Sequence, residues 1–257
     1  MIRLEHGDCL ELMKTIESNS VSMVFTDLPY GTTNCKWDSL IDLESWWKEV
    51  NRICKPNAAV VLTAQTPFDK VLGASNLKNL KYEWIIEKTS ATGHLNAKIC
   101  PMKAHENVLV FYKKPPTYNP QKTTGHIRKT SKTGKKYNSE CYGNESAKTD
   151  YDSTERYPRS VLEFKWDKQK SNHHSTQKPI ELGRYMIRTY TNPGDTILDT
   201  CMGSGPFVLS AVELGRNIIG FDNGTCEKKK SKYFGMKWKD AVFDMLEDIK
   251  LNKRGNA

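Results

Sequence analysis

The sequence predicts an α/β domain built on a mostly parallel, twisted sheet. Short apolar runs alternate with segments that have the period of amphipathic helices over much of the 257 residues. Three of the apolar runs end at an aspartate, and one of these is followed by a glycine-containing turn that leads into a helix. Strands that alternate with helices are typical of parallel sheets, because each helix returns the chain to the edge where the next strand starts.

The N-terminal half contributes the first part of this alternation. Residues 43–57 have the pattern of an amphipathic helix, which ends near Pro56 because proline cannot continue a helix. Strands are expected at 21–27, 58–64, 82–88 and 106–113. A polar loop joins the last two, which predicts an antiparallel hairpin in the otherwise parallel sheet.

The C-terminal part resumes the alternation. Its expected elements are helices at 179–191 and 206–215 and strands at 195–199 and 217–222. From about 114 to 172 the periodicity disappears, and Gly, Ser, Thr, Asn, Lys and Tyr dominate. We therefore expect one domain in two halves, 1–113 and 173–257, with 114–172 inserted between them.

The charge of the chain is concentrated in that insertion. The net charge is +9 and the pI is near 9.1. Between Lys113 and Lys170 there are 14 Lys and Arg against 7 Asp and Glu, so this segment carries +7 of the +9. A basic segment within a nearly neutral frame indicates a polyanionic partner such as nucleic acid. A solvated, partly disordered insertion is the alternative.

Composition also indicates the cellular compartment. The seven cysteines are scattered and never form a C-x-x-C pair, so we expect reduced thiols in a cytoplasm, with no disulfide framework and no metal site. No run approaches the roughly 18 apolar residues of a membrane span, and the first residues lack the apolar centre of a signal peptide. A membrane partner is therefore not expected.

The stretch TDLPYG (26–31) places an acid, a proline, an aromatic ring and a glycine directly after a buried strand. Pro29 rigidifies the turn and removes a backbone donor. Asp27 then presents a carboxylate, and Tyr30 a flat ring, at the end of a strand.

A second constellation, LDTCMGSG, continues through a helix and a strand to Asp222. This second pattern suits a nucleoside, because the glycines let the backbone approach the ligand while Asp222 accepts hydrogen bonds from ribose hydroxyls. The third glycine of a dinucleotide fingerprint would fall at Val208 and is missing, which argues against NAD and an oxidoreductase. An ordinary strand–helix–strand unit with a tight turn is the alternative for this segment.

Together, DLPY, LDTCMGSG and TQKP (176–179) resemble the motifs of DNA amino-methyltransferases that use S-adenosylmethionine. The catalytic motif precedes the basic region and the cofactor loop, which is the circularly permuted, β-class order. The resemblance implies a Rossmann-like methyltransferase fold, S-adenosylmethionine as cofactor and double-stranded DNA as partner. It implies a prokaryotic or phage-infected cell, and it leaves open a homodimer and a cognate restriction endonuclease.

The resemblance assigns catalysis to Asp27, Leu28, Pro29 and Tyr30. The Asp27 carboxylate and a carbonyl of Leu28 or Pro29 would accept the two hydrogens of the target amine, while Tyr30 stacks on the flipped base. Adenine N6 is favoured over cytosine N4 because an aspartate opens the motif. An N4-cytosine enzyme and a catalytically weak DNA-binding relative are the alternatives.

The cofactor residues implied are Asp8, Cys9, Asp27, Lys178, Asp199, Cys201, Met202, Gly203, Ser204, Gly205, Asp222 and Asn223. Asp8 would face the adenine of the cofactor, although it is equally suited to cap a short helix. The family pattern has proline at Leu28 and phenylalanine at Cys201, so the cofactor pocket of this chain departs from it.

Contacts to DNA are expected from basic and aromatic residues near the catalytic motif, in the hairpin loop and in the insertion. The candidates are Lys36, Trp37, Lys98, His105, Arg128, Lys129 and Lys132. Residues 114–172 would recognise the target sequence.

Overall fold

The computed structural model describes residues 1–32, 35, 38–131, 137–139, 143–145, 150–164, 173–174 and 176–254. They divide into two compact units. The larger comprises Met1–Asn119 and Ser160–Ala257, and the smaller comprises Pro120–Arg159. Among the described residues, no helix is both long and apolar enough to cross a membrane.

The larger unit contains an eight-stranded sheet in the order β1-β12-β11-β2-β3-β5-β4-β10. The strands are β1 (Ile2–His6), β2 (Val21–Thr26), β3 (Cys54–Ala64), β4 (Leu80–Thr92), β5 (Lys103–Phe111), β10 (Val161–Phe164), β11 (Thr196–Asp199) and β12 (Asn217–Asp222). Within this described sheet, β5 runs antiparallel to β3 and β4, and all other neighbours are parallel. The predicted mostly parallel sheet with an antiparallel hairpin is therefore confirmed.

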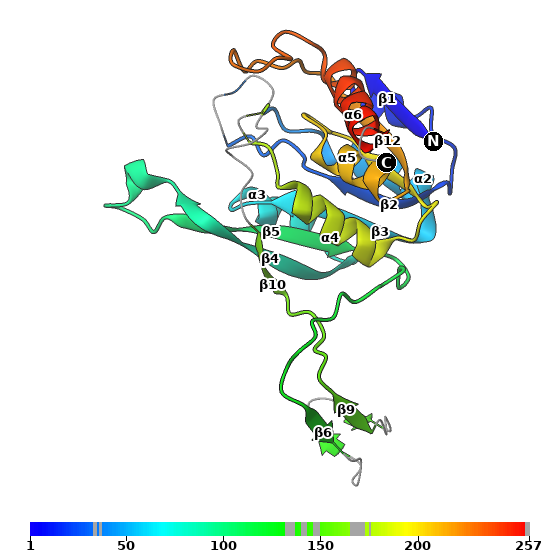
Figure 1. Cartoon of the computed structure of the whole chain (residues 1–257), viewed down its shortest axis with the longest axis vertical. Coiled ribbons are helices and arrows are strands. Elements are labelled where there is room, and N and C mark those ends of the chain that lie inside the picture. The colour runs from blue at the N-terminus through cyan, green and yellow to red at the C-terminus, as the bar shows by residue number, and fades with distance from the viewer. Residues whose placement is uncertain are drawn as a thin grey trace. The chain divides into compact units, whose positions relative to one another are not determined.

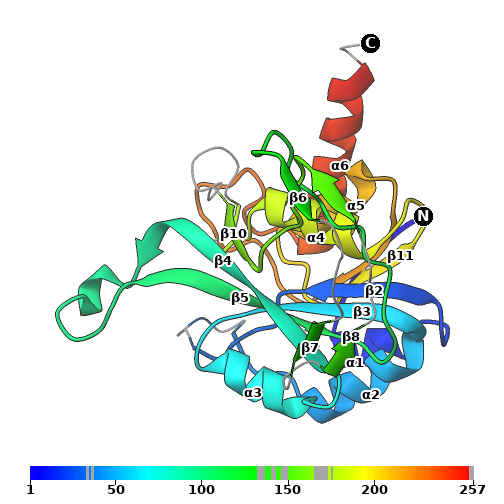
Figure 2. The ribbon, with the colours of Figure 1, turned by 90° about the horizontal axis from the view of Figure 1, so that it is seen from below.

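Helices cover both faces of the sheet (Figures 1 and 2). On one face lie α1 (Cys9–Met13), α2 (Leu43–Ile53) and α3 (Phe68–Ser75), and on the other α4 (Ile180–Tyr190), α5 (Pro206–Glu213) and α6 (Trp238–Arg254). Side chains alternate across each strand, so Met23 and Phe25 of β2 join the core under α4–α6 while Val24 joins the core over α1–α3. Burial on both faces explains why these strands read as continuous apolar runs.

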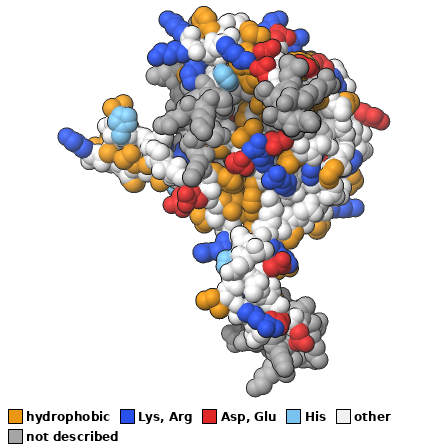
Figure 3. Space-filling view, in the orientation of Figure 1, with side chains coloured by type: hydrophobic (Ala, Val, Ile, Leu, Met, Phe, Trp, Pro, Cys, Tyr) orange, Lys and Arg blue, Asp and Glu red, His pale blue; other side chains and the backbone are white. Residues whose placement is uncertain are grey.

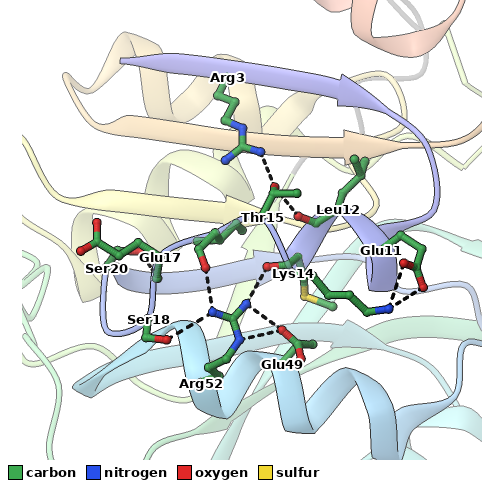
Figure 4. Close-up of polar contacts among 12 residues, drawn as sticks. Arg3, Glu11, Leu12, Lys14, Thr15, Glu17, Ser18, Ser20, Glu49 and Arg52 are labelled. Carbon is green, nitrogen blue, oxygen red and sulfur yellow. Dashed lines mark hydrogen bonds and ion pairs between the residues drawn. The ribbon is translucent and has the colours of Figure 1, made fainter.

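Arg52, near the end of α2, ties the end of the short helix α1 and the turn after it to α2 (Figure 4). Its guanidinium donates to the carbonyl oxygens of Met13 at 2.8 Å and Ile16 at 2.7 Å, and it pairs with Glu49 at 2.7 Å. At the other end of α1, the Asp8 carboxylate accepts from the backbone of Leu10 at 2.8 Å. These contacts satisfy carbonyls and amides that a five-residue helix leaves open, and they position the loop after β1.

The smaller unit, residues 120–159, is shorter than the insertion expected at 114–172. Residues 161–164 were expected to lie in that insertion, but they pair with β4 in the main sheet as β10. In its described residues the smaller unit contains two antiparallel pairs: β6 (Lys129–Ser131) with β9 (Tyr151–Ser153), and β7 (Tyr137–Ser139) with β8 (Gly143–Glu145). Short strands of this kind carry little apolar periodicity, which is why the sequence showed none there.

Candidate active site

A cavity of about 510 Å³ opens at the carboxyl ends of the parallel strands β1, β2, β11 and β12. Ligands bind at this edge in open α/β sheets, because loops leaving adjacent strands diverge there. Most of the residues assigned to catalysis or cofactor line this cavity: Asp8, Cys9, Asp27, Leu28, Pro29, Tyr30, Lys178, Asp199, Cys201, Met202, Gly203, Ser204, Asp222 and Asn223.

The turn after β2 is held by an aspartate that sequence reasoning missed. The buried Asp38 carboxylate accepts hydrogen bonds from the backbone N–H groups of Tyr30 at 2.7 Å, Gly31 at 2.9 Å and Thr32 at 2.9 Å. Gly31 has φ of 65°, in the left-handed region that glycine adopts without steric cost. Three amides converging on one carboxylate fix the chain that follows Asp27.

Asp27 is the centre of a dense set of polar contacts. Its Oδ1 accepts from the Tyr30 hydroxyl at 2.7 Å and from the Thr63 hydroxyl of β3, and its Oδ2 lies 2.9 Å from Lys178 Nζ. A carboxylate oxygen offers two acceptor positions. Among the described contacts, Oδ2 therefore keeps one position for a further donor, and the side chain is 25% exposed in the cavity.

Lys178 links Asp27 to a second carboxylate, Glu106, which in turn pairs with a second lysine, Lys88. Lys178 Nζ lies 3.3 Å from Glu106 Oε2 of β5, and Glu106 Oε1 lies 2.6 Å from Lys88 Nζ of β4. The side chains of Lys88, Lys178 and Glu106 are only 4%, 6% and 12% exposed. Four charges of alternating sign thus run from Asp27 to Lys88, and sequence reasoning had named only two of them.

The charge states of this set follow from its geometry. Burial alone would lower the pKa of Lys178, but the neighbouring Asp27, Tyr30 and Glu106 outweigh it and raise that pKa well above its ordinary value. Burial alone would raise the pKa of Glu106, but Lys178 and Lys88 lower it. Burial and the charge of Asp27 raise the pKa of Tyr30, so its hydroxyl keeps the proton that it donates to Asp27.

The ring of Tyr30 already has a stacking partner on one face. It stacks on Phe68 with centroids 5.2 Å apart and an interplanar angle of 21°. Lys178 Nζ lies 5.2 Å from the centroid of the Tyr30 ring. The expected stacking of a base on Tyr30 is therefore limited to the face that Phe68 leaves uncovered.

The glycine loop after β11 is tied to the end of β12. Asp222 Oδ2 accepts from the Gly203 N–H at 2.9 Å, and Oδ1 accepts from the Gly224 N–H at 2.7 Å. Gln177, which sequence reasoning did not assign, accepts from the Ser204 hydroxyl at 3.0 Å. Asp222 was expected to bind ribose hydroxyls; in the structure its carboxylate also joins the two loops that border the cavity.

Asp199 is a second buried acid on the wall of the cavity. Its Oδ1 accepts from the Cys201 N–H at 3.2 Å, whereas its Oδ2 has no hydrogen-bond partner among the described residues. Burial raises the pKa of Asp199 to about 7. An orphaned, buried carboxylate oxygen on a cavity wall is a position where a cationic ligand group would be stabilised.

Three predicted cofactor residues have structural roles beside or instead of ligand contact. Asp8 caps α1, the alternative that its sequence context left open. Gly205 does not line the cavity: with φ of 73° it caps α5, and a Cβ there would lie 2.7 Å from Val242 of α6. A hydrogen bond with Cys9, and burial, raise the pKa of the Cys201 thiol, which stays protonated and packs as a small residue against the core over α1–α3.

The candidate DNA-binding residues lie in different places. Lys98 and His105 are exposed in and beside the β4–β5 loop of the larger unit. Arg128 is exposed in the smaller unit and forms a bidentate ion pair with Asp152, and Lys129 is the first residue of β6. Lys36, Trp37 and Lys132 lie outside the described residues.

Comparison with known proteins matches most of the chain to the family that its sequence motifs resemble. A family model described as DNA methylase (N6_N4_Mtase) matches residues 21–232. Type II methyltransferase M1.MboII of Moraxella bovis is 27% identical over 242 residues, 86% of this chain and 91% of that protein. Type II methyltransferase M.HinfI of Haemophilus influenzae is 26% identical over 280 residues, 96% of this chain and 68% of that protein.

Solved structures share the fold at lower sequence identity. The M1.HpyAVI–SAM complex has a TM-score of 0.60 at 20% identity and covers 95% of this chain and 100% of that one. The PvuII DNA methyltransferase, described as cytosine-N4-specific, has a TM-score of 0.64 at 16% identity and covers 96% and 92%. Because the family model spans most of the chain and its motifs meet in one cavity, the chain belongs to the N6/N4 family of DNA methylases.

Proposed function

We propose that this DNA methyltransferase transfers the methyl group of S-adenosylmethionine to the N6 amine of an adenine that is flipped out of double-stranded DNA. The observation that carries the proposal is the Asp27 carboxylate, held at the cavity with an acceptor position left on Oδ2. Cytosine N4 is the alternative target, supported by the cytosine-N4-specific PvuII neighbour. The same cavity would accept either amine.

The residues of the cavity fit the cofactor. The orphaned Asp199 Oδ2 suits the ammonium of its methionine part, and Asp222 has acceptor positions left for ribose hydroxyls. S-adenosylmethionine, when bound, would supply a methyl group activated by its positively charged sulfur. Since the donor is already activated, the chain's own task is to orient the poorly nucleophilic amine.

Asp27 performs that orientation through its remaining acceptor position. The lone pair of an exocyclic amine is delocalised into the base, and a hydrogen bond from the amine to Asp27 Oδ2 turns that lone pair toward the methyl group. Tyr30, Thr63 and Lys178 hold the carboxylate in one orientation, so little rearrangement is needed when the amine arrives. Orientation of this kind can contribute roughly 7–11 kcal/mol to lowering a barrier.

The remaining assignments belong to the same proposal. Residues 1–113 would supply the catalytic half and 173–257 the cofactor half, while the smaller unit within 114–172, Pro120–Arg159, would recognise the DNA sequence. The motif resemblance and the bacterial type II relatives support a prokaryotic cytoplasmic enzyme, paired with a restriction endonuclease or acting alone, as monomer or homodimer. A catalytically weak DNA-binding relative is the alternative.

The test is incubation of the protein with S-adenosylmethionine labelled in its methyl group and mixed genomic DNA, followed by digestion to nucleosides. Label in N6-methyl-2′-deoxyadenosine supports the proposal, and label in N4-methyl-2′-deoxycytidine supports the alternative target. Sequencing the modified DNA gives the recognition sequence. Cofactor binding without label in any base would leave only the weak DNA-binding relative.

Cofactor binding is expected to depend on pH through Asp199. Because its pKa is raised to about 7, Asp199 is largely protonated below that pH, whereas a cationic group binds its ionised form. Affinity for S-adenosylmethionine should therefore rise between pH 6 and about 7.5 as Asp199 ionises; above this range the α-ammonium of the cofactor, with an ordinary pKa of about 7.7–8.0, loses its charge. Calorimetric titrations at about pH 6.0, 6.5, 7.0 and 7.5 measure this rise. Asp199→Asn should remove the dependence; if the variant keeps it, another group is responsible.

The basic insertion is expected to supply part of the salt dependence of DNA binding. Neutralising Arg128, Lys129 and Lys132 together should make the slope of log K against log salt shallower by about two to three, since each phosphate contact contributes roughly 0.9. The pairing of Arg128 with Asp152 places the expected value nearer two. Titrations at four salt concentrations decide it. An unchanged slope would show that DNA is held by other loops.

A further inference from the structure

The loop between β4 and β5 exposes large apolar side chains outside the cavity. Leu95 is 87% exposed, Ile99 83% and Met102 41%. The hairpin that carries them extends well beyond the other strands of the sheet in both ribbon views (Figures 1 and 2). Several large apolar side chains gathered on one exposed loop indicate an interaction surface.

The shape of this loop rests on backbone contacts. Gly93 has φ of 90° and starts the short 3₁₀ turn η1 (His94–Asn96). The N–H groups of Ile99 at 2.9 Å and Cys100 at 3.0 Å donate to the carbonyl of Asn96. Every residue from 93 to 105 is exposed. The Leu95 and Ile99 side chains therefore contribute little buried area to the fold, and their replacement should leave it intact.

The charges around these side chains favour a nucleic acid. Residues 89–105 include Lys98, Lys103 and two histidines but no Asp or Glu. Apolar, basic and histidine side chains occur together on the projecting hairpin in Figure 3. Cations attract the phosphate backbone, while exposed Leu and Ile are side chains that wedge between base steps.

The loop also starts at the rim of the cavity. Thr92 and Gln65 line the cavity, Lys103 Nζ donates to Gln65 Oε1 at 3.4 Å, and Lys103 pairs with Thr92 across the hairpin. Further along the same two strands, Lys88 and Glu106 reach the set of charges around Asp27. A base that enters the cavity leaves its stack, so the duplex from which it came must lie near this rim.

We infer that Leu95 and Ile99 form an apolar wedge that enters the duplex beside the flipped base, an inference that rests on the proposed function. Removing a base from its stack costs free energy, because stacking and pairing are lost. Apolar side chains that occupy the gap replace part of the lost stacking and keep water out of it. Lys98 and Lys103 would hold the flanking phosphates.

The test compares methyl transfer to two duplexes that contain the recognition sequence found by sequencing. One is fully paired, and the other has an abasic site opposite the target, where flipping needs less energy. Leu95→Ser/Ile99→Ser should lower kcat/KM on the paired duplex by about tenfold and stay within about twofold of the parent on the abasic duplex. The matched control is Val71→Ser/Leu77→Ser, which removes two apolar side chains that are 57% and 69% exposed and do not line the cavity.

Several results of this comparison would overturn the wedge. The wedge is wrong if Leu95→Ser/Ile99→Ser loses kcat/KM equally on both duplexes, or loses none on the paired duplex. It is also wrong if the control variant shows the same selective loss on the paired duplex. Sedimentation of parent and variant tests a second copy of the chain as occupant: a dimer that dissociates only in the Leu95→Ser/Ile99→Ser variant would also overturn it. If the parent methylates neither duplex, the proposed function fails, and the wedge with it.

Discussion

Replacing Asp27 by alanine is expected to lower the rate of methyl transfer by roughly a thousandfold, the upper range for loss of one preorganised polar group. The variant loses the acceptor for the target amine, whereas Lys178 keeps its contact with Glu106 at 3.3 Å. Single-turnover transfer of labelled methyl to DNA measures the chemical step directly. Calorimetric titration should show cofactor affinity within about threefold of the parent, because Asp199 and the glycine loop are untouched.

Asp27→Asn is the matched variant for this measurement. Its amide retains one acceptor oxygen in the same place but has no charge to pair with Lys178. If the acceptor oxygen is the essential feature, Asp27→Asn should lose less activity than Asp27→Ala. If the negative charge is the essential feature, the two variants should lose the same activity. Near-parental transfer by the alanine variant would remove Asp27 from the mechanism.

Glu106→Ala is expected to lower the free energy of unfolding by about 3–5 kcal/mol, the cost of removing one partner from a buried ion pair. The substitution leaves Lys88, only 4% exposed, without the carboxylate that lies 2.6 Å away. Denaturant unfolding measures the change. Adding Lys88→Met should restore about 1–3 kcal/mol, because the buried charge is removed while Lys178 keeps Asp27.

An exposed pair of similar length provides the control. Lys14 and Glu11 are 2.7 Å apart but 59% and 70% exposed, so Glu11→Ala should have a far smaller effect on unfolding. An equal loss from Glu11→Ala, or no recovery in the double variant, would show that burial of the Glu106 pair is not the cause.

The contribution of Glu106 to the free energy of unfolding should also depend on pH. Its folded-state pKa is lowered by Lys178 and Lys88 against the opposing effect of burial. A carboxyl with a lowered folded pKa stabilises fully above its unfolded pKa of about 4.3, and this stabilisation is lost as pH falls through the folded pKa. The difference between parent and Glu106→Ala should therefore shrink on acidification below about pH 4.

The sequence was sufficient for the strands β2, β3, β4, β5, β11 and β12 and for the acids at strand ends, but it did not predict β1, α3 or β10. Apolar runs such as 21–26 and 217–222 must be strands buried on both faces, and the residues that follow parallel strands meet at one edge. The family resemblance assigned Asp27, Asp199 and Asp222 to one site, and the cavity contains all three. The sequence also predicted the antiparallel hairpin, because only a polar loop separates its strands.

Only the tertiary structure decided which side chains surround those acids. Lys88 meets Glu106 because the register of β4 and β5 pairs Glu87 with His105, and no local pattern specifies a register between distant residues. Asp38 likewise becomes a backbone acceptor only when the chain after β2 folds back on it. Hydrophobic periodicity encodes where a strand is buried. The contacts of a charged side chain depend instead on strand order and register, which become fixed only when the whole sheet forms.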